Sequence, residues 1–305
     1  MPKRDARHYF VFNPAAGKRA TRARLDAALA VLEPNSYTLY TTKGAGDAAA
    51  YVRALCKAEP GPKRFYACGG DGTLGEVATG VMGFPETEIG AWPCGSGNDY
   101  VKYFGGENRF LDLSRQVKAG SVPVDLMRVG GHCAINAVNL GLEAEAAATM
   151  VHIRHHPLFN GKNGYVLGVL SAVTRHMRTE CEVTADGLKL HSGPMLTLSL
   201  ACGKYVGGGF MCAPQSKNDD GLMELALVKP MSRLRLARLI GTYKKGEHLD
   251  DPRMLPFINY RRVKEALIEG DRDIRLCLDG EIAIGRRFKV ELLPGAARFI
   301  LPETV

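Results

Sequence analysis

The feature that most constrains this chain is the alternation of strand and helix signals in its first third. Short β-rich segments at residues 9–12, 37–40, 64–68 and 89–92 are separated by segments with helical spacing of apolar residues. Parallel neighbouring strands need a crossover connection, and a helix usually supplies it. The alternation therefore predicts an α/β domain over residues 1–125, with a parallel sheet and helices on both faces.

The pattern changes after about residue 124. Most of the following apolar segments are short, strand-like and separated by turn signals such as Gly130-Gly131 and Asp186-Gly187. One segment, residues 233–243, carries a helical apolar stripe instead. We therefore expect a mainly antiparallel β domain over residues 126–290, and a C-terminal segment, residues 291–305, that returns to the first domain.

Charge and cysteine usage narrow the classes of partner. The 305 residues carry a formal net charge of +8, which suits nucleotide phosphates, acidic lipid headgroups or nucleic acid, although a solvated basic surface explains it equally well. No apolar run approaches the roughly 20 residues that span a bilayer, so we expect a cytoplasmic protein that meets a membrane only from outside.

None of the eight cysteines forms a C-x-x-C pair, so reduced thiols are expected and a zinc site is not. His152, His155 and His156 lack a carboxylate partner and are interpreted as surface residues.

Three glycine-rich loops follow predicted strands of the first domain, at the carboxyl ends where open α/β sheets bind ligands. Glycines let a backbone approach phosphate closely, and a following helix N-terminus adds a dipole that favours anions. One such loop is as often a structural turn, but three at matching strand ends favour a nucleotide-phosphate site. The candidate nucleotide-binding residues in these loops are Asn13, Pro14, Gly17, Gly69, Gly70, Asp71, Gly72, Thr73, Gly95, Ser96, Gly97, Asn98 and Asp99.

Two familiar nucleotide motifs do not fit these loops. Gly70, Gly72 and Gly75 form G-x-G-x-x-G after a strand, but the dinucleotide motif also needs an acidic residue about 20 positions on, at the end of the next strand. Glu86 and Glu88 come too early and precede that strand. No G-x-x-x-x-G-K-[ST] sequence is present. A nicotinamide oxidoreductase and a P-loop enzyme are therefore disfavoured.

The three loops, in this order and at about this spacing, resemble the catalytic domain of diacylglycerol kinases. The close resemblance is to the soluble bacterial lipid kinases and their sphingosine-kinase relatives. Residues 207–222 resemble a further family block, which implies a structural magnesium bound by the Asp220 carboxylate and by the backbone carbonyls of Lys217 and Leu222. The similarity thus extends over nearly the whole chain.

The chain departs from the family pattern at two positions. Ser96 stands where the family usually has threonine, which keeps the hydroxyl. Gly75 stands where the family often has asparagine, so a side chain that could help to hold the loop or the nucleotide is missing.

The resemblance implies transfer of the γ-phosphoryl group of ATP to a lipid hydroxyl, with Mg²⁺ bridging the phosphates. Asp71 could hold that ion directly or through water, and Thr42 matches a family nucleotide contact, although it could equally be an ordinary strand-end threonine. Asp279-Gly280-Glu281 resembles the family's catalytic D-G-E, and either acid could accept the proton of the acceptor hydroxyl.

Alternatives remain at this point. Gly-Gly-Asp-Gly-Thr also occurs in NAD kinases, so a kinase for a soluble acceptor is one rival, and a non-catalytic nucleotide sensor is another. Nucleic-acid binding is disfavoured because aromatic and basic residues are not interleaved. The oligomeric state is open, a homodimer included. Five basic residues on and after the helical stripe suit either an anionic membrane surface or plain solvent: Arg233, Arg235, Arg238, Lys244 and Lys245.

Overall fold

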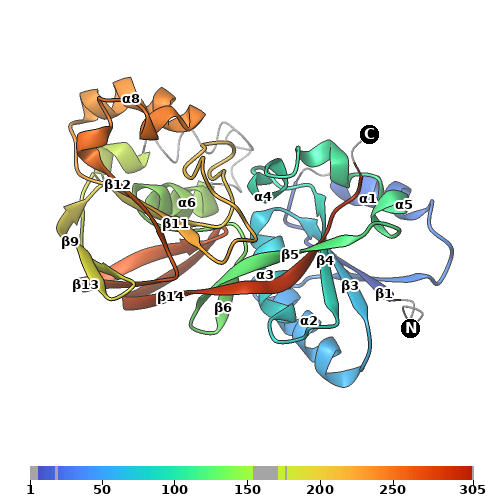
Figure 1. Ribbon diagram of the computed structural model, residues 1–305. Helices are drawn as coiled ribbons and strands as arrows, with labels where there is room; N and C mark the ends of the chain where they lie inside the picture. Colours follow the sequence, from blue (N-terminus) through green and yellow to red (C-terminus); the bar gives the residue numbers. More distant parts are fainter. Residues whose placement is uncertain (1–5, 18–19, 154–170, 176, 304–305) are drawn as a thin grey trace.

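The computed structural model describes residues 6–17, 20–153, 171–175 and 177–303, and the side chains of residues 150–153 are not described. An α/β domain and a β-rich domain share one continuous sheet (Figure 1). Lys18 of the first glycine-rich loop, His155 and His156 lie outside the described residues, as does the side chain of His152.

The first domain contains a parallel sheet with strand order β2-β1-β3-β4. The strands are β1 (Arg7–Phe12), β2 (Tyr37–Thr41), β3 (Lys63–Gly69) and β4 (Thr87–Pro93). The helices are α1 (Thr21–Leu29), α2 (Asp47–Ala58), α3 (Asp71–Val81), α4 (Asp99–Lys102), the 3-10 turn η1 (Glu107–Phe110) and α5 (Leu113–Gln116).

Burial in β1 shows why helices cover both faces of this sheet. Tyr9 and Val11 belong to the core that contains α2 and α3, whereas Phe10 and Phe12 belong to the core that contains α1 and α5. Successive side chains of a strand point to opposite faces, so a strand covered on both sides is apolar throughout.

The second domain is mainly antiparallel, with strand order β12-β11-β10-β7-β13-β14. The strands after β4 are β5 (Ser121–Val129), β6 (His132–Ala134), β7 (Ala137–Gly141), β8 (Thr179–Ala185), β9 (Leu188–Met195), β10 (Thr197–Ala201), β11 (Met223–Val228), β12 (Ile258–Val263), β13 (Glu265–Leu278) and β14 (Glu281–Ile300). The helical elements described here are α6 (Leu142–Ile153), α8 (Arg233–Lys245), η2 (Glu247–Leu249) and η3 (Leu255–Phe257).

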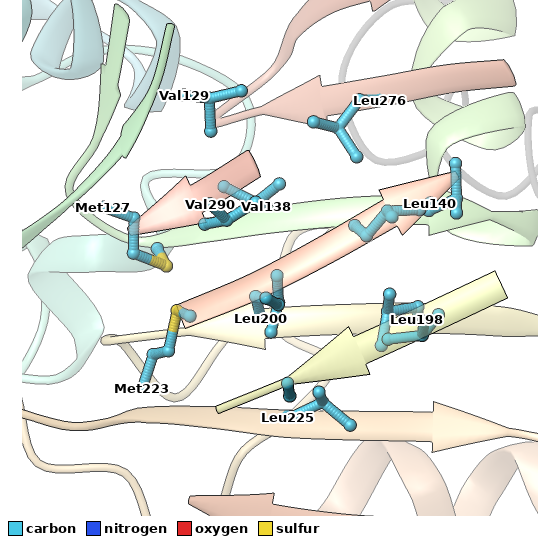
Figure 2. Packing of buried hydrophobic residues seen from close by; sticks show 14 of the residues in the cluster. Met127, Val129, Val138, Leu140, Leu198, Leu200, Met223, Leu225, Leu276 and Val290 are labelled. Carbon is cyan, nitrogen blue, oxygen red and sulfur yellow. The ribbon is translucent and has the colours of Figure 1, made fainter. Parts of the chain in front are cut away.

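One large apolar cluster forms the central part of the core of this second domain. Figure 2 shows side chains from β5, β7, β10, β11, β13 and β14 gathered into one packed layer. Val138, Leu198, Leu225 and Leu276 are each almost fully buried within it. Because these strands come from distant parts of the sequence, the layer fixes where the loops at their ends lie.

β14 connects the two domains. Its first part pairs with β13, and near its far end Phe299 pairs with Ile89 of β4 in a parallel bridge. Figure 1 shows this strand, in dark red, crossing from the second domain into the first. The predicted fold class, a parallel α/β domain followed by a mainly antiparallel β domain, is confirmed.

Two features of the strands were not apparent from local sequence. β14 is one long strand over Glu281–Ile300, so it contains most of the expected C-terminal segment, residues 291–305. β6 ends at Ala134 and β7 begins at Ala137, and the amides of Ile135 and Asn136 between them donate to the side chain of Asp279, in the turn after β13. α6 was not predicted, since its many alanines leave little apolar periodicity.

Two sequence expectations about thiols and membrane segments can be examined directly. All eight cysteines are free, and all except Cys56 are buried. No helix in the described part of the chain is long and apolar enough to cross a bilayer.

Candidate active site

The three glycine-rich loops meet at one edge of the parallel sheet, beyond β1, β3 and β4. Asn13 follows β1 and spans two of them: its side-chain amide donates to Thr73 Oγ1 at 3.1 Å, and its Oδ1 accepts the N–H of Ala15 at 2.9 Å. Thr42, which follows β2, lies at the same edge: it is buried, and its main-chain N–H donates to the carbonyl of Phe12 at the end of β1, at 2.8 Å. Asn13 therefore fixes the first loop against the start of α3.

Glycine is required where these loops touch. A Cβ at Gly95 would lie 2.5 Å from the Cα of Gly70, and a Cβ at Gly69 would lie 2.2 Å from Thr73 Oγ1. Gly17 has a φ of 77°, and a Cβ there would lie 2.5 Å from the carbonyl oxygen of Cys94. The loops thus pack main chain against main chain, as a phosphate-binding edge requires.

The third loop is locked by its own side chains. Asn98 has a φ of 50°, and its amide both accepts the N–H of Gly95 and donates to the Gly95 carbonyl, each at 3.0 Å. Asp99 begins α4, where its Oδ1 pairs with Lys102 Nζ at 2.5 Å. Its Oδ2 accepts the N–H of Gly208, in the second domain, at 2.7 Å. Pro14 and Ser96 remain exposed at the rim.

Asp71 lies between the second and third loops. It begins α3, and its Oδ1 accepts the N–H of Tyr100 at 3.0 Å. A Cβ at Gly97 would lie 3.0 Å from its Oδ2. Burial, and then the neighbouring Asp99 carboxylate, raise the pKa of Asp71. A bound cation next to this oxygen would remove that penalty, so Asp71 fits the role predicted for it toward a phosphate-bound Mg²⁺.

The turn between β13 and β14 brings the D-G-E acids to the same edge. Asp279 has a φ of 47°, and its carboxylate accepts three main-chain N–H groups: from Ile135 at 2.6 Å, Asn136 at 3.1 Å and Ala137 at 2.8 Å. Burial raises the pKa of Asp279 to about 7, although the three amides act in the opposite direction. Asp279 is therefore immobile and shielded from solvent.

This turn packs against two glycines of α3, Gly72 and Gly75. A Cβ at Gly72 would lie 3.5 Å from the Asp279 carbonyl oxygen, and a Cβ at Gly75 would lie 3.1 Å from Asp279 Oδ2. The space that an asparagine would need at position 75 is thus occupied by Asp279. Gly75 thus allows the turn of the second domain to lie close against α3.

Glu281 faces a second carboxyl group. It is half-buried and hydrogen-bonded to Glu76 of α3, whose Oε2 also accepts the N–H of Ala48 at 3.0 Å. Two carboxyl groups share a hydrogen bond only when one of them holds a proton. Burial, and then this contact with Glu76, accordingly raise the pKa of Glu281.

The predicted metal loop lies between β10 and β11. Asp125 holds it by accepting the N–H of Gly221 at 2.8 Å. Asp220 Oδ1 accepts the N–H of Leu222 at 3.2 Å, and its Oδ2 is paired with Arg262. Lys217 is exposed. Because both oxygens of Asp220 are engaged, the residues as they lie do not fit the predicted magnesium site.

An apolar cavity lies between α6 and α8. The space within it that a water-sized sphere can occupy measures about 50 Å³. Among the described residues that line it, the acidic one is Glu143, which accepts hydrogen bonds from Ser199 Oγ at 2.8 Å and from the Tyr243 hydroxyl at 2.9 Å. Most of the other lining residues are aliphatic, including Leu142, Ala146, Leu196, Leu236, Leu239 and Ile240.

Sequence reasoning missed Glu76 and misjudged Gly75. A signal for both was present, because positions 75 and 76 come three and four residues after Gly72, the last residue of the Gly-Gly-Asp-Gly loop, and so share a helix face with it. No local pattern identifies the amides of Ile135–Ala137 as the anchor of Asp279, since the two segments are more than 140 residues apart.

Two known protein families match this chain, one in each domain. The family model of the diacylglycerol kinase catalytic domain matches residues 7–129. The model of the YegS C-terminal NAD kinase beta sandwich-like domain matches residues 136–301. Fold, site and matches together define a kinase.

The chain belongs to the diacylglycerol kinase catalytic-domain family, as the sequence predicted. It is 30% identical over 273 residues to the probable lipid kinase YegS-like of Yersinia pestis (strain Pestoides F), covering 84% of each chain. It is 26% identical over 293 residues to the protein of the same name from Shewanella frigidimarina (strain NCIMB 400), covering 94% of this chain and 92% of that one. A diacylglycerol kinase-like crystal structure from Bacillus anthracis str. Sterne superposes over 100% of both chains with a TM-score of 0.76 and 23% identity, which is a likeness of fold.

Proposed function

We propose that this protein is a lipid kinase that transfers the γ-phosphoryl group of ATP to a hydroxyl of diacylglycerol or a related lipid. One observation carries the proposal: the Asp279–Glu281 turn of the second domain lies against Gly72 and Gly75, at the start of the helix that follows the Gly-Gly-Asp-Gly loop. An acceptor hydroxyl placed there would meet both the phosphate cradle and a carboxyl group. The names of the relatives, probable lipid kinases, support the same class.

The nucleotide would lie along the edge formed by the three loops and Thr42. Main-chain groups of Gly70–Thr73 would neutralise the phosphates, and the hydroxyls of Thr73 and Ser96 would donate to phosphate oxygens. Mg²⁺ would supply charge neutralisation between the phosphates, with Asp71 as the protein group that holds it.

Glu281 is the better candidate for the proton acceptor. Asp279 accepts three main-chain N–H groups, so its carboxylate is already committed to holding the turn. Glu281 is only partly buried, and burial together with the neighbouring Glu76 raises its pKa. In the proposed step the lipid O–H gives its proton to ionised Glu281, its oxygen bonds to the γ-phosphorus, and the bond to the β–γ bridging oxygen breaks to release ADP.

The apolar cavity would take a lipid chain. β7 begins at Ala137, which contacts Asp279, and leads directly to Leu142 at the wall of the cavity. Five residues of extended strand span roughly 17 Å, a distance that an extended aliphatic chain can bridge. A lipid with its hydroxyl at Glu281 could therefore have its tail between α6 and α8.

Peripheral membrane binding through α8 would bring the lipid to this cavity. Leu234 and Leu255 are 62% and 52% exposed beside the basic residues of this helix. Arg233 is held by the carbonyls of Val173 and Thr174, so Arg238 is the more available charge. Replacement of Leu234 and Arg238 by glutamate should reduce sedimentation with vesicles that contain anionic lipid, and unchanged sedimentation would contradict the docking model.

The activity is tested by incubating the protein with radiolabelled ATP and Mg²⁺ against a panel of neutral lipids in micelles, with NAD as the soluble acceptor. We expect label in a lipid, and no label with a Glu281→Gln variant. Label in NAD alone would identify the soluble-acceptor kinase instead. ATP binding without turnover on any acceptor would identify a nucleotide sensor.

A further inference from the structure

An arginine pairs with the acidic residue of the loop where the family resemblance implies a magnesium ion. Arg262 lies on β12 directly opposite Glu224 of β11 in the antiparallel ladder. Its Nε donates to Glu224 Oε1 at 3.1 Å, and its Nη2 pairs with Asp220 Oδ2. One guanidinium group therefore bridges a strand carboxylate and the loop carboxylate.

Burial makes this bridge important to the fold. The Glu224 side chain is 1% exposed and that of Asp220 is 22% exposed, whereas the side chain of Arg262 is 42% exposed and covers both. Removing the guanidinium would leave a buried carboxylate without a counter-charge, which is among the costliest single changes in a protein.

We propose that the guanidinium group of Arg262 is the resident cation of this loop, and that the fold needs no divalent metal here. Magnesium requires near-octahedral oxygen ligands, and both oxygens of Asp220 are already engaged. A guanidinium group also presents planar, paired donors that match carboxylates, which a hydrated ion does not.

The loop that Arg262 stabilises supports the active-site edge. Asn218, in the middle of this loop, donates from its side chain to the Tyr100 hydroxyl at 3.3 Å, and its carbonyl accepts the N–H of Asp125 at 2.7 Å. Tyr100 follows Asp99, and its own N–H is bound by Asp71. By pairing with Asp220, Arg262 therefore stabilises the loop whose Asn218 contacts Tyr100, next to the third glycine-rich loop. The inference concerns stability and does not depend on the proposed activity.

Thermal unfolding of the full chain without nucleotide tests the proposal. The wild-type protein should have the same Tm in EDTA and in excess Mg²⁺. Arg262→Met should have a clearly lower Tm in EDTA, and Mg²⁺ should restore part of the loss because the two carboxylates are then free to bind it. Arg261→Met is the matched control, since Arg261 is the neighbouring residue on β12 and its guanidinium group donates to the Asn259 side chain at 3.4 Å. It should behave like the wild type in both buffers.

Two results would overturn the inference. One is a wild-type Tm that falls in EDTA and recovers with Mg²⁺, with Asp220→Asn abolishing the recovery. The other is an Arg262→Met protein as stable as Arg261→Met. If Arg262→Met does not fold, the wild-type comparison in EDTA and Mg²⁺ decides alone, supported by metal analysis of the purified protein, which should find no retained Mg²⁺.

Discussion

Replacing Gly75 by alanine should separate stability from activity. The added Cβ would lie 3.1 Å from Asp279 Oδ2 and 3.2 Å from Asp279 Cβ, closer than ordinary contact. Asp279 cannot rotate away, because three main-chain N–H groups hold its carboxylate. The turn that carries Glu281 must therefore shift by a few tenths of an ångström relative to α3.

The two energetic effects of this change oppose each other. Alanine favours a helix interior over glycine by about 1 kcal/mol, and overpacking costs about 1–3 kcal/mol. We therefore expect the free energy of unfolding to fall by only about 0–2 kcal/mol. A misplacement of 1 Å costs roughly a hundredfold in rate, so a smaller shift should lower kcat by about tenfold.

The assay compares kcat for lipid phosphorylation with the free energy of unfolding from urea titration. Gly241→Ala is the matched control, since Gly241 lies within α8 and a Cβ there meets nothing within 4 Å. It should gain about 1 kcal/mol of stability and keep the wild-type kcat. A Gly75→Ala enzyme with wild-type kcat would refute the argument that the turn is positioned by contact with α3.

Three further predictions concern the same edge. The raised pKa of Glu281 means that its carboxyl must lose a proton before it can act, so kcat should increase as pH rises through neutrality; a rate that falls over this range would exclude it as the base. Glu76→Gln should lower the pKa of Glu281 and move this increase to lower pH, and an unmoved profile would show that the two carboxyls are not coupled. Asn98→Ala loses both hydrogen bonds to Gly95 in a left-handed conformation, so urea titration should show a loss of about 2 kcal/mol, and no loss would mean that the third loop is held by other contacts.

Much of the nucleotide-binding edge could be predicted from local sequence. Glycine-rich loops at the ends of β1, β3 and β4 must meet at one edge, because parallel strands all end on the same side of a sheet. The D-G-E turn was assigned to this edge only from the family resemblance, since no local sequence pattern links residues near 280 to residues near 72. The metal loop shows the limit of resemblance, because Asp220 was identified but Arg262, 42 residues further on, was not.

The sequence by itself determined the alternation of strands and helices, the order of the glycine-rich loops and hence the family, because each depends on local periodicity or on residues close together in the chain. Tertiary structure decided which groups face one another: Asp279 against Gly75, Glu281 against Glu76 and Arg262 between two carboxylates. Those pairings depend on strand register and on β14 crossing between the domains. Register follows from the packing of a whole core, which no short segment encodes.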